Sequence, residues 1–396
     1  MKLGDICSKI GSGATPRGGK DSYKDSGTAI IRSQNVLDWT FSSGGLAFID
    51  DDQSKALSNV EVKQDDVLLN ITGDSVARAC MVPSEFLPAR VNQHVAIIRA
   101  NEKANGLFLL AWLQANKGTL LKLAYSGATR NALTKRMLEN LDVNLPPIDV
   151  QNKVAAFIDS IQAKITLNTK LNGYLEELLL AECANLENGI EESCTVGDYC
   201  KRIYSGGTPS TKISSYWNGM LPWLSSGETR ARFIINAEKT ITPEGVESSS
   251  TKLANRGSIV IASAGQGFTR GQTSMLLFDT YVNQSIVAMV PEEKCGSYLL
   301  FALAARYEEL RAWSDSTSTR GSLSGKILKQ FVLPCLTKAQ LERFESLASP
   351  LINVIESNLR ESNSLAALRD SLLPKLLSGE IDVSKIDLTK LNSHLA

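Results

Sequence analysis

Long apolar runs are missing from this 396-residue sequence, and so is any excess of charge of one sign. No segment approaches the ~20 apolar residues of a membrane-spanning helix, and the start, MKLGDICSKI, lacks the apolar region of a secretory signal. We therefore expect a cytoplasmic protein with no membrane partner. The formal net charge of zero counts mildly against a nucleic-acid binder, although the distribution of charge matters more than its sum.

Residues that usually carry catalysis or bind metals are also scarce. The two histidines are His94, where the second half of the chain has Ser285, and His394 in a polar tail. The seven cysteines are odd in number and contain no C-x-x-C pair, which predicts free thiols in a reducing compartment and no structural zinc. These cysteines are Cys7, Cys80, Cys183, Cys194, Cys200, Cys295 and Cys335.

Glycine is concentrated near the start, in GSGATPRGGK at residues 11–20, which superficially resembles a phosphate-binding loop. Such a loop needs glycine six residues before the lysine and a hydroxyl directly after it. The sequence has Ala14 and Asp21 at these two places, and no long apolar strand precedes the stretch. We therefore interpret it as a turn and not as a nucleotide site.

An internal repeat explains this turn. LGDICSKIGSGATPRGGKDSY recurs as VGDYCKRIYSGGTPSTKISSY, with a shift of 193 from Gly4 to Gly197. VNQHVAIIRA at 91–100 recurs as VNQSIVAMVP at 282–291, and a Thr-Arg pair recurs at 129–130 and 319–320. Because the second copy reads SGGTPSTK, the recurring feature is Gly-x-Thr-Pro. We interpret it as a structural corner in which glycine allows a positive φ and proline fixes φ near −65°.

Each copy first shows short strand patterns, then a short helix, a polar loop and a strand ending in Leu-Pro, after which the apolar period becomes helical. A helix of about 35 residues, roughly 50 Å long, follows in each copy. Asn168 and Asn358 occupy equivalent places on or beside its apolar stripe, where a polar residue can set the register. We predict an α+β fold of two pseudo-repeated mixed α/β globules, separated by two long antiparallel coiled-coil helices. The predicted segments are globules at 1–147 and 188–335, helical spacers at 148–187 and 336–381, and a polar tail at 382–396.

No convincing catalytic set emerges. NLPPID at 144–149 departs from the Asn-Pro-Pro-Tyr motif of amino-methyltransferases, and no G-x-G-x-x-G follows a strand. We therefore predict that the chain catalyses no reaction and binds no cofactor or metal.

Both globules carry loop residues suited to DNA, since arginine can read guanine, Asn and Gln can read adenine, and Lys or Thr can hold phosphate. These residues differ between copies while the scaffold motifs persist. The candidates are Arg17, Lys20, Arg32, Gln34, Asn35, Arg78, Arg90 and Arg130 in the first copy, and Lys212, Arg230, Arg232, Gln266, Thr269, Arg270, Gln272 and Arg320 in the second.

Taken together, the doubled motifs resemble the specificity subunit of type I restriction–modification systems over about residues 1–381. The resemblance rests on the doubled Gly-Asp and Gly-x-Thr-Pro, Val-Asn-Gln, the Thr-Arg loops, the Leu-Pro before each helix and the closing LRDSLLPKLLSGEIDV. It implies two target recognition domains on double-stranded DNA, each reading one half of a bipartite, asymmetric site, with the helices as spacer. It also implies two modification (methyltransferase) subunits that methylate adenine with S-adenosylmethionine, and restriction/motor subunits that use ATP and Mg²⁺. The first helix departs from the family pattern because it ends in LENGIEES without Leu-x-x-Gly-Glu-Ile.

Two alternatives remain at this point. The first is a coiled-coil scaffold whose globules bind protein, which zero net charge favours slightly. The second is a nucleotide-dependent enzyme built on the opening loop.

Overall fold

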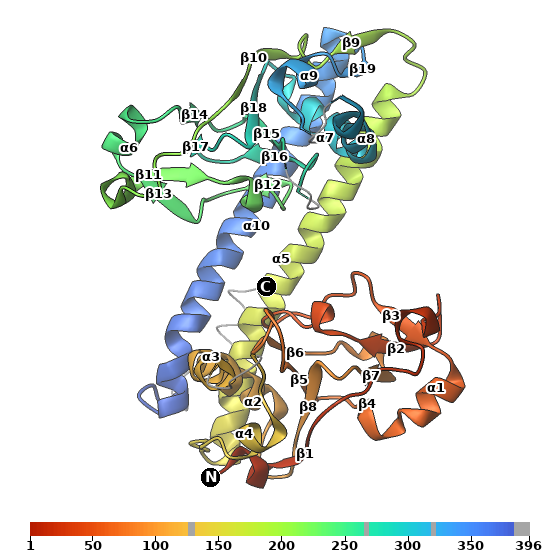
Figure 1. Cartoon of the computed structure of the whole chain (residues 1–396), viewed down its shortest axis with the longest axis vertical. Helices are drawn as coiled ribbons and strands as arrows, with labels where there is room; N and C mark the ends of the chain where they lie inside the picture. The colour runs from red at the N-terminus through yellow and green to blue at the C-terminus, as the bar shows by residue number, and fades with distance from the viewer. Residues whose placement is uncertain (126–130, 265–268, 318–321, 384–396) are drawn as a thin grey trace. The chain divides into compact units, whose positions relative to one another are not determined.

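The computed structural model describes residues 1–125, 131–264, 269–317 and 322–383, with only the backbone of Lys20, Asp21 and Thr317. The chain divides into two compact units, one formed by Met1–Thr166 with Asn363–Ala396 and the other by Leu167–Ser362. Each unit joins a strand-rich globule to a segment of each of two long helices, α5 and α10 (Figure 1). The predicted α+β class with two similar globules and two long helices is confirmed.

Helices in both units are mostly short apart from these two. The α-helices are α1 (Asp51–Ala56), α2 (Gly106–Ala115), α3 (Lys117–Tyr125), α4 (Lys135–Glu139), α5 (Ile148–Glu187), α6 (Pro243–Glu247), α7 (Gly296–Ala305), α8 (Tyr307–Thr317), α9 (Gly325–Lys329) and α10 (Lys338–Ser378).

The first unit contains two four-stranded sheets, ordered β1-β8-β5-β6 and β3-β2-β7-β4. Leu68 and Ile97 of the first sheet face Ile30 and Val91 of the second, while the opposite face packs on α2 to α4. β5 is buried along its length because both of its faces are covered. The strands are β1 (Cys7–Ser12), β2 (Thr28–Ile31), β3 (Ala47–Ile49), β4 (Glu61–Val62), β5 (Val67–Asn70), β6 (Ala79–Met81), β7 (Ala89–Val91) and β8 (Val95–Ala100).

The second unit repeats this plan, with sheets ordered β10-β18-β15-β16-β12 and β13-β11-β17-β14, and adds a two-stranded sheet β19-β9. Its strands are β9 (Ser193–Thr195), β10 (Cys200–Ser205), β11 (Trp217–Leu224), β12 (Phe233–Ile234), β13 (Lys239–Ile241), β14 (Lys252–Ala254), β15 (Ile259–Ala262), β16 (Thr273–Leu276), β17 (Thr280–Val282), β18 (Ile286–Pro291) and β19 (Val332–Pro334).

The repeat extends to strand register. β1 pairs antiparallel with β8 and shifts register between Cys7 and Lys9. β10 pairs antiparallel with β18 and shifts between Cys200 and Arg202. A bulge at the same place in both copies is a property of the shared scaffold, since bulges re-aim the strand that follows.

α5 and α10 run antiparallel and contact each other within each unit. In the first unit, Arg369 Nη1 donates to Gln162 Oε1 at 2.7 Å. In the second, Asn168 Nδ2 donates to Glu361 Oε2 at 2.7 Å, and Asn358 Nδ2 donates to Asn172 Oδ1 at 2.8 Å. Asn168 and Asn358, singled out by the repeat, thus lie in a polar layer between the two helices.

The cysteines differ from expectation at one pair. Cys194 and Cys335 form a disulfide with a Cα–Cα distance of 4.8 Å, so the prediction of free thiols is wrong there. The pairing of β9 with β19 aligns Cys194 with Leu333 and so brings Cys335 close. A separation of 141 residues hides this proximity from any spacing rule. Within the described ranges, no helix is both long and apolar enough to cross a membrane.

Candidate nucleic-acid interface

The recurring motifs of the first unit meet at one end of the β1–β8 pair. The Thr15 hydroxyl donates to Gln93 Oε1, and Gly13 N donates to Asn92 O at 3.1 Å. A Cβ on Gly13 would lie 1.7 Å from Val91 O, so this position must be glycine. Gly-x-Thr-Pro and Val-Asn-Gln are therefore two sides of one corner.

The second unit builds the same corner. The Thr208 hydroxyl donates to Gln284 Oε1, and Gly207 N donates to Val282 O at 3.0 Å. A Cβ on Gly206 would lie 1.8 Å from the same Val282 oxygen. The glycines near the start of each copy thus serve close backbone packing, as the repeat predicted.

The corner presents different side chains in the two copies. In the first, His94 is exposed, with Thr72 Oγ1 at 2.7 Å from Nδ1 and Gln93 Nε2 at 3.2 Å from Nε2. In the second, Ser285 follows the equivalent glutamine. Asn92 Oδ1 accepts from His94 N at 3.0 Å, and Asn283 Oδ1 accepts from Ser285 N at 3.1 Å, so the same turn displays both residues.

The described residues that follow the predicted Thr-Arg pairs bond to residues just beyond the ends of β5 and β15. Arg130, Arg320 and Gln266 lie outside the described residues, as does the side chain of Lys20. Downstream of the loops, Leu133 N donates to Ile71 O and Leu323 N donates to Ser263 O, both at 2.8 Å. Leu133 and Leu323 thus hold equivalent places beside the ends of β5 and β15.

In the second unit, Arg232, Arg270 and Arg311 lie close to one another. Arg232 Nη1 donates to Thr273 O at 3.1 Å, and Arg270 Nη1 pairs with Asp315 Oδ1 at 2.8 Å. Arg311 Nη1 donates to Arg270 O at 3.3 Å and to Tyr307 Oη at 3.0 Å. Asp315 thus pairs with Arg270, while Arg232 and Arg311 donate to the neighbouring Thr273, Arg270 and Tyr307 oxygens.

A cavity of about 230 Å³ lies beside Arg232, and its lining residues are Arg232, Gly271, Gln272, Thr273, Ala304 and Tyr307. Burial lowers the pKa of Arg232, and the carboxylate of Glu176 opposes this shift. A partly desolvated guanidinium beside a small polar cavity is suited to an anion such as a phosphate oxygen. The structure thus brings the predicted Arg232, Arg270 and Gln272 together.

Sequence reasoning missed Arg311 and Tyr307. They stand four residues apart on α8, a spacing that places them on one helix face, and the Arg311 guanidinium lies 5.6 Å from the Tyr307 ring centroid. This spacing in YEELR is the signal that would have found them.

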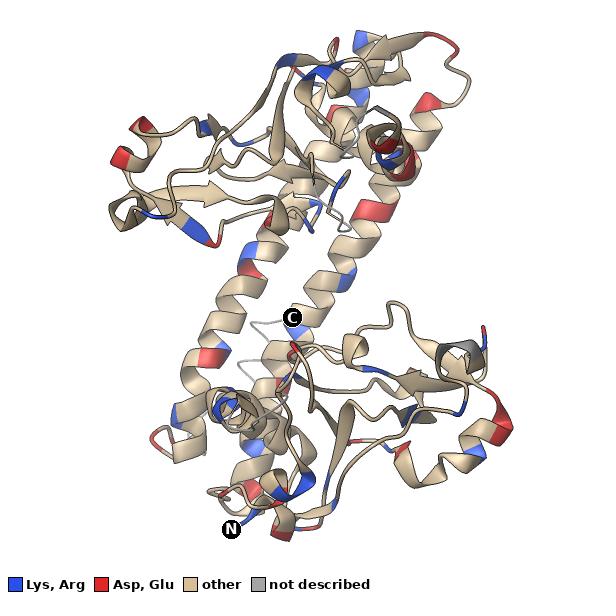
Figure 2. Ribbon diagram, in the orientation of Figure 1, with Lys and Arg blue, Asp and Glu red and all other residues tan. Residues whose placement is uncertain are grey.

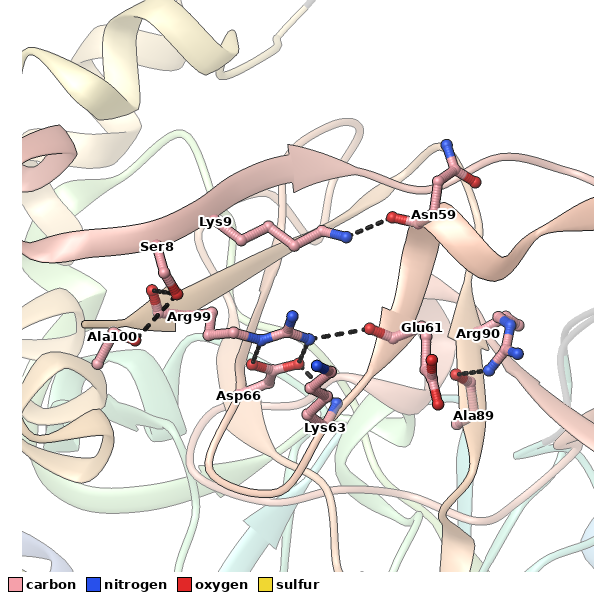
Figure 3. Close-up of polar contacts among 10 residues, drawn as sticks. All are labelled: Ser8, Lys9, Asn59, Glu61, Lys63, Asp66, Ala89, Arg90, Arg99 and Ala100. Atoms are coloured by element: carbon pink, nitrogen blue, oxygen red, sulfur yellow. Dashed lines mark hydrogen bonds and ion pairs between the residues drawn. The ribbon is translucent and has the colours of Figure 1, made fainter. Parts of the chain in front are cut away.

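Some predicted contact residues face the protein interior. Asn35 is fully buried, and its Nδ2 donates to Ser42 O at 2.9 Å. Arg90 is 7% exposed, and its Nε donates to Ser54 O at 3.2 Å. Its Nη1 donates to Ala89 O at 3.0 Å, as Figure 3 shows. Arg270 is likewise buried. In this structure these side chains satisfy carbonyl or carboxylate groups of their own globule, which a list of polar residue types does not reveal.

The other predicted residues lie at or near the surface. Arg32 stacks over the Tyr23 ring at 5.3 Å, and Gln34 Nε2 donates to Gly45 O at 3.2 Å. Arg17, Lys212 and Arg230 are exposed, whereas Arg78, Thr269 and Gln272 are half-buried. Both signs of charge are interspersed over the two units (Figure 2).

Comparison with known proteins shows the family to which the chain belongs. The sequence model of the type I restriction modification DNA specificity domain matches residues 1–177 and 191–360, once in each copy of the repeat. The chain belongs to this family.

Two relatives and one solved structure extend the finding. The specificity subunit of the type I restriction enzyme EcoR124I/EcoR124II of Escherichia coli is 28% identical over 200 residues, 50% of this chain and 48% of that protein. The type I restriction enzyme MjaIX specificity subunit of Methanocaldococcus jannaschii is 25% identical over 169 residues, 41% of this chain and 38% of that protein. The matches to these family members thus span less than half of their length.

The crystal structure of the S subunit of the type I restriction–modification system of M. genitalium shares the fold. Its TM-score is 0.57 at 14% sequence identity, and 95% of each chain is covered. At this identity the likeness speaks for the fold of the specificity family alone.

Proposed function

We propose that the chain is the sequence-specific DNA recognition subunit of a type I restriction–modification complex. It binds a bipartite, asymmetric site on double-stranded DNA, with one target recognition domain in residues 1–147 and another in 188–335. The observation that carries this proposal is the doubled corner, which holds one backbone scaffold and displays different side chains, His94 and Ser285. Two domains that recognise different half-sites need the same backbone support and different contact side chains.

The phosphate-binding part of the proposal rests on the second unit. Arg232 lines the 230 Å³ cavity, and Arg311 donates to Tyr307 Oη, which belongs to a residue that also lines it. The planar guanidinium fork of each side chain matches the geometry of a phosphate group. Asn35, Arg90 and Arg270 act in this proposal as internal supports of the contact loops. Phosphate contacts of this kind position the duplex, and the corner residues specify its sequence.

Partner subunits have a candidate docking surface on α5. Leu167, Leu171, Tyr174 and Leu178 are 56%, 39%, 66% and 44% exposed, respectively. Their spacing of three or four residues forms one apolar stripe on the helix. We propose that modification subunits cover this stripe and the restriction/motor subunits join through them. S-adenosylmethionine, ATP and Mg²⁺ then bind to those partners, and the chain itself directs methylation of adenine without catalysing it.

Methylome sequencing tests the proposal. A host that expresses this chain together with its modification subunit should acquire adenine methylation at one bipartite motif, and a host that expresses the modification subunit alone should not. The purified chain alone should transfer no methyl group. Methylation by the isolated chain, or an unmodified genome with both subunits present, would contradict the proposal.

The protein-binding scaffold is the second candidate, because the net charge is zero and both signs are interspersed (Figure 2). Retention of one duplex from a pool of random DNA fragments by the assembled complex separates the two functions. A scaffold would retain no particular sequence.

A further inference from the structure

The repeat allows one helical region to be compared with its own second copy. α3 begins at Lys117 and α8 at Tyr307, while α4 begins at Lys135 and α9 at Gly325. Both pairs are related by the same shift, so side chains at equivalent numbers occupy equivalent places in the two globules.

The second copy fills the space between these helices with aromatic rings. The Trp313 ring of α8 packs on Phe331 just after α9, with 5.1 Å between ring centroids. The first copy has Leu123 and Leu141 at these two positions. Two large rings are thus replaced by smaller side chains.

A cavity of about 670 Å³ lies at this place in the first copy, and we call it the α3–α4 cavity. Leu120, Leu123, Met137 and Leu141 line it, together with Trp112 of α2. The first copy has Trp112 on α2 where the second copy has Ala302. The Trp112 indole lines the cavity and does not fill it. The volume falls in the usual range of specific binding sites.

The rim of the α3–α4 cavity carries a cation. Asp142 lines the cavity too, but its carboxylate is held by Lys2 Nζ at 2.8 Å. Arg136 is exposed on the rim and, within the described part of the chain, forms no ion pair. An apolar cavity beside an available guanidinium is complementary to an aromatic group that carries a neighbouring negative charge.

We propose that the α3–α4 cavity receives an aromatic side chain of a partner polypeptide, next to an acidic residue that pairs with Arg136. The second copy shows what the space accepts, since its own tryptophan lies there. The chain's own end is an unsuitable occupant, because residues 384–396 contain no Phe, Tyr or Trp. This docking site shares no residue with the corner or with the exposed stripe of α5.

Two small probes test the proposal on the full chain. N-acetyltryptophan carries an indole and one carboxylate, and N-acetyltryptophanamide lacks the charge. We expect saturable binding of the acid, seen as a shift of the Met137 methyl resonance, while the methyl resonance of the 93% exposed Met220 stays unchanged. The amide should bind more weakly, and Arg136→Ala should remove the difference between the probes.

Reciprocal variants locate the site. Leu123→Trp with Leu141→Phe copies the second globule into the first, and should weaken probe binding by at least about tenfold while raising the melting temperature. Trp313→Leu with Phe331→Leu should create a second binding site and lower the melting temperature. If the double replacement in the first copy unfolds the chain, Leu123→Phe alone and the Arg136 comparison still test the site.

Three results would overturn the proposal. The first is the absence of saturable binding to the unmodified chain. The second is binding that Leu123→Trp with Leu141→Phe leaves intact. The third is an unmodified chain that is dimeric and becomes monomeric in that variant, because a second copy of this chain would then be the occupant.

Discussion

At Gly13 the absence of a side chain lets two chain segments touch. A Cβ there would lie 1.7 Å from Val91 O, whereas a Cβ on Gly11, two residues earlier in β1, meets no atom within 4 Å. We expect Gly13→Ala to lower the free energy of unfolding by about 2 kcal/mol, since the corner must open to relieve the overlap. Gly11→Ala is the matched control and should change stability by less than about 1 kcal/mol. Equal effects in urea denaturation would show that the corner is not tightly packed.

Arg311 is a proposed phosphate contact that sequence reasoning did not find. If it holds a phosphate, Arg311→Ala should weaken DNA binding by the assembled complex and reduce the slope of log K against log salt by about one. Arg311→Lys should keep the slope and lose part of the affinity, because a point charge replaces the fork. Arg343→Ala, an exposed change on α10, serves as control. An unchanged slope in Arg311→Ala places the phosphate elsewhere.

The Arg256–Glu356 pair gives a pH prediction. Arg256 Nη1 donates to Glu356 Oε1 at 2.8 Å, and hydrogen bonding to Arg256 is the main cause that holds the pKa of Glu356 below its usual value. A carboxylate with a lowered folded-state pKa stabilises above its unfolded pKa of about 4.3 and loses that contribution as pH falls through the folded value. Arg256→Ala should therefore cost about 1 kcal/mol or less at pH 7, because Arg256 is half exposed.

The difference in melting temperature between the unmodified chain and Arg256→Ala should shrink as the pH falls below about 4. Thermal melts at a series of pH values measure it. A difference that stays constant down to pH 3 would show that Glu356 does not depend on Arg256.

Residues also show where sequence reasoning stops. The repeat marked Thr15 and Gln93 as scaffold, but only the β1–β8 register reveals that they touch. Arg90 and Asn35 have the residue types of DNA contacts, yet strand β7 buries Arg90 and the turn at Ser33–Asn35 buries Asn35. Contacts that depend on loop conformation leave no periodic signal in the sequence, so the candidate site could be predicted as a region and not as a residue list.

At the scale of elements, the helical period was the strongest signal. It predicted two helices of about 35 residues, and α5 and α10 contain 40 and 41 residues. The pattern also placed Asn168 and Asn358 on or beside the seam. It could not show that Asn172 and Glu361 complete the polar layer, since the partners depend on how the antiparallel helices align.

The polar layer should show energetic coupling. Asn358→Leu leaves the amide oxygen of Asn172, which is 6% exposed, without its donor and should cost about 1–2 kcal/mol. Asn172→Leu with Asn358→Leu removes both partners and should cost less than the sum of the single changes, with a coupling of about 1 kcal/mol in a double-mutant cycle. Asn353→Leu on the exposed side of α10 is the control and should couple to neither. Additive effects would mean that the layer does not fix the alignment.

At the scale of the whole molecule, the proposed function assigns sequence recognition to the globules and the length of the gap to the long helices. Residues 1–145 include one corner and its loops, and α5 contributes to the spacer. Exchanging residues 1–145 for the equivalent part of another family member should change one half of the methylated site and keep both the other half and the gap. A change in both halves, read from the methylome, would contradict independent recognition by the two domains.

Lengthening α5 tests the spacer by itself. Four residues inserted after Leu171 add about one turn and roughly 6 Å along the axis. They keep the apolar stripe nearly in phase, because four residues advance the helix by little more than one full turn. Since a base pair rises about 3.4 Å, we expect a methylated site with the same two half-sequences and a gap longer by one or two base pairs. Inserting two residues at the same place would rotate the stripe to the other side of the helix and should instead lower stability and activity. Methylome sequencing reads half-sequences and gap in one experiment: an unchanged gap after the four-residue insertion, in a chain that still directs methylation, would falsify the spacer role of α5.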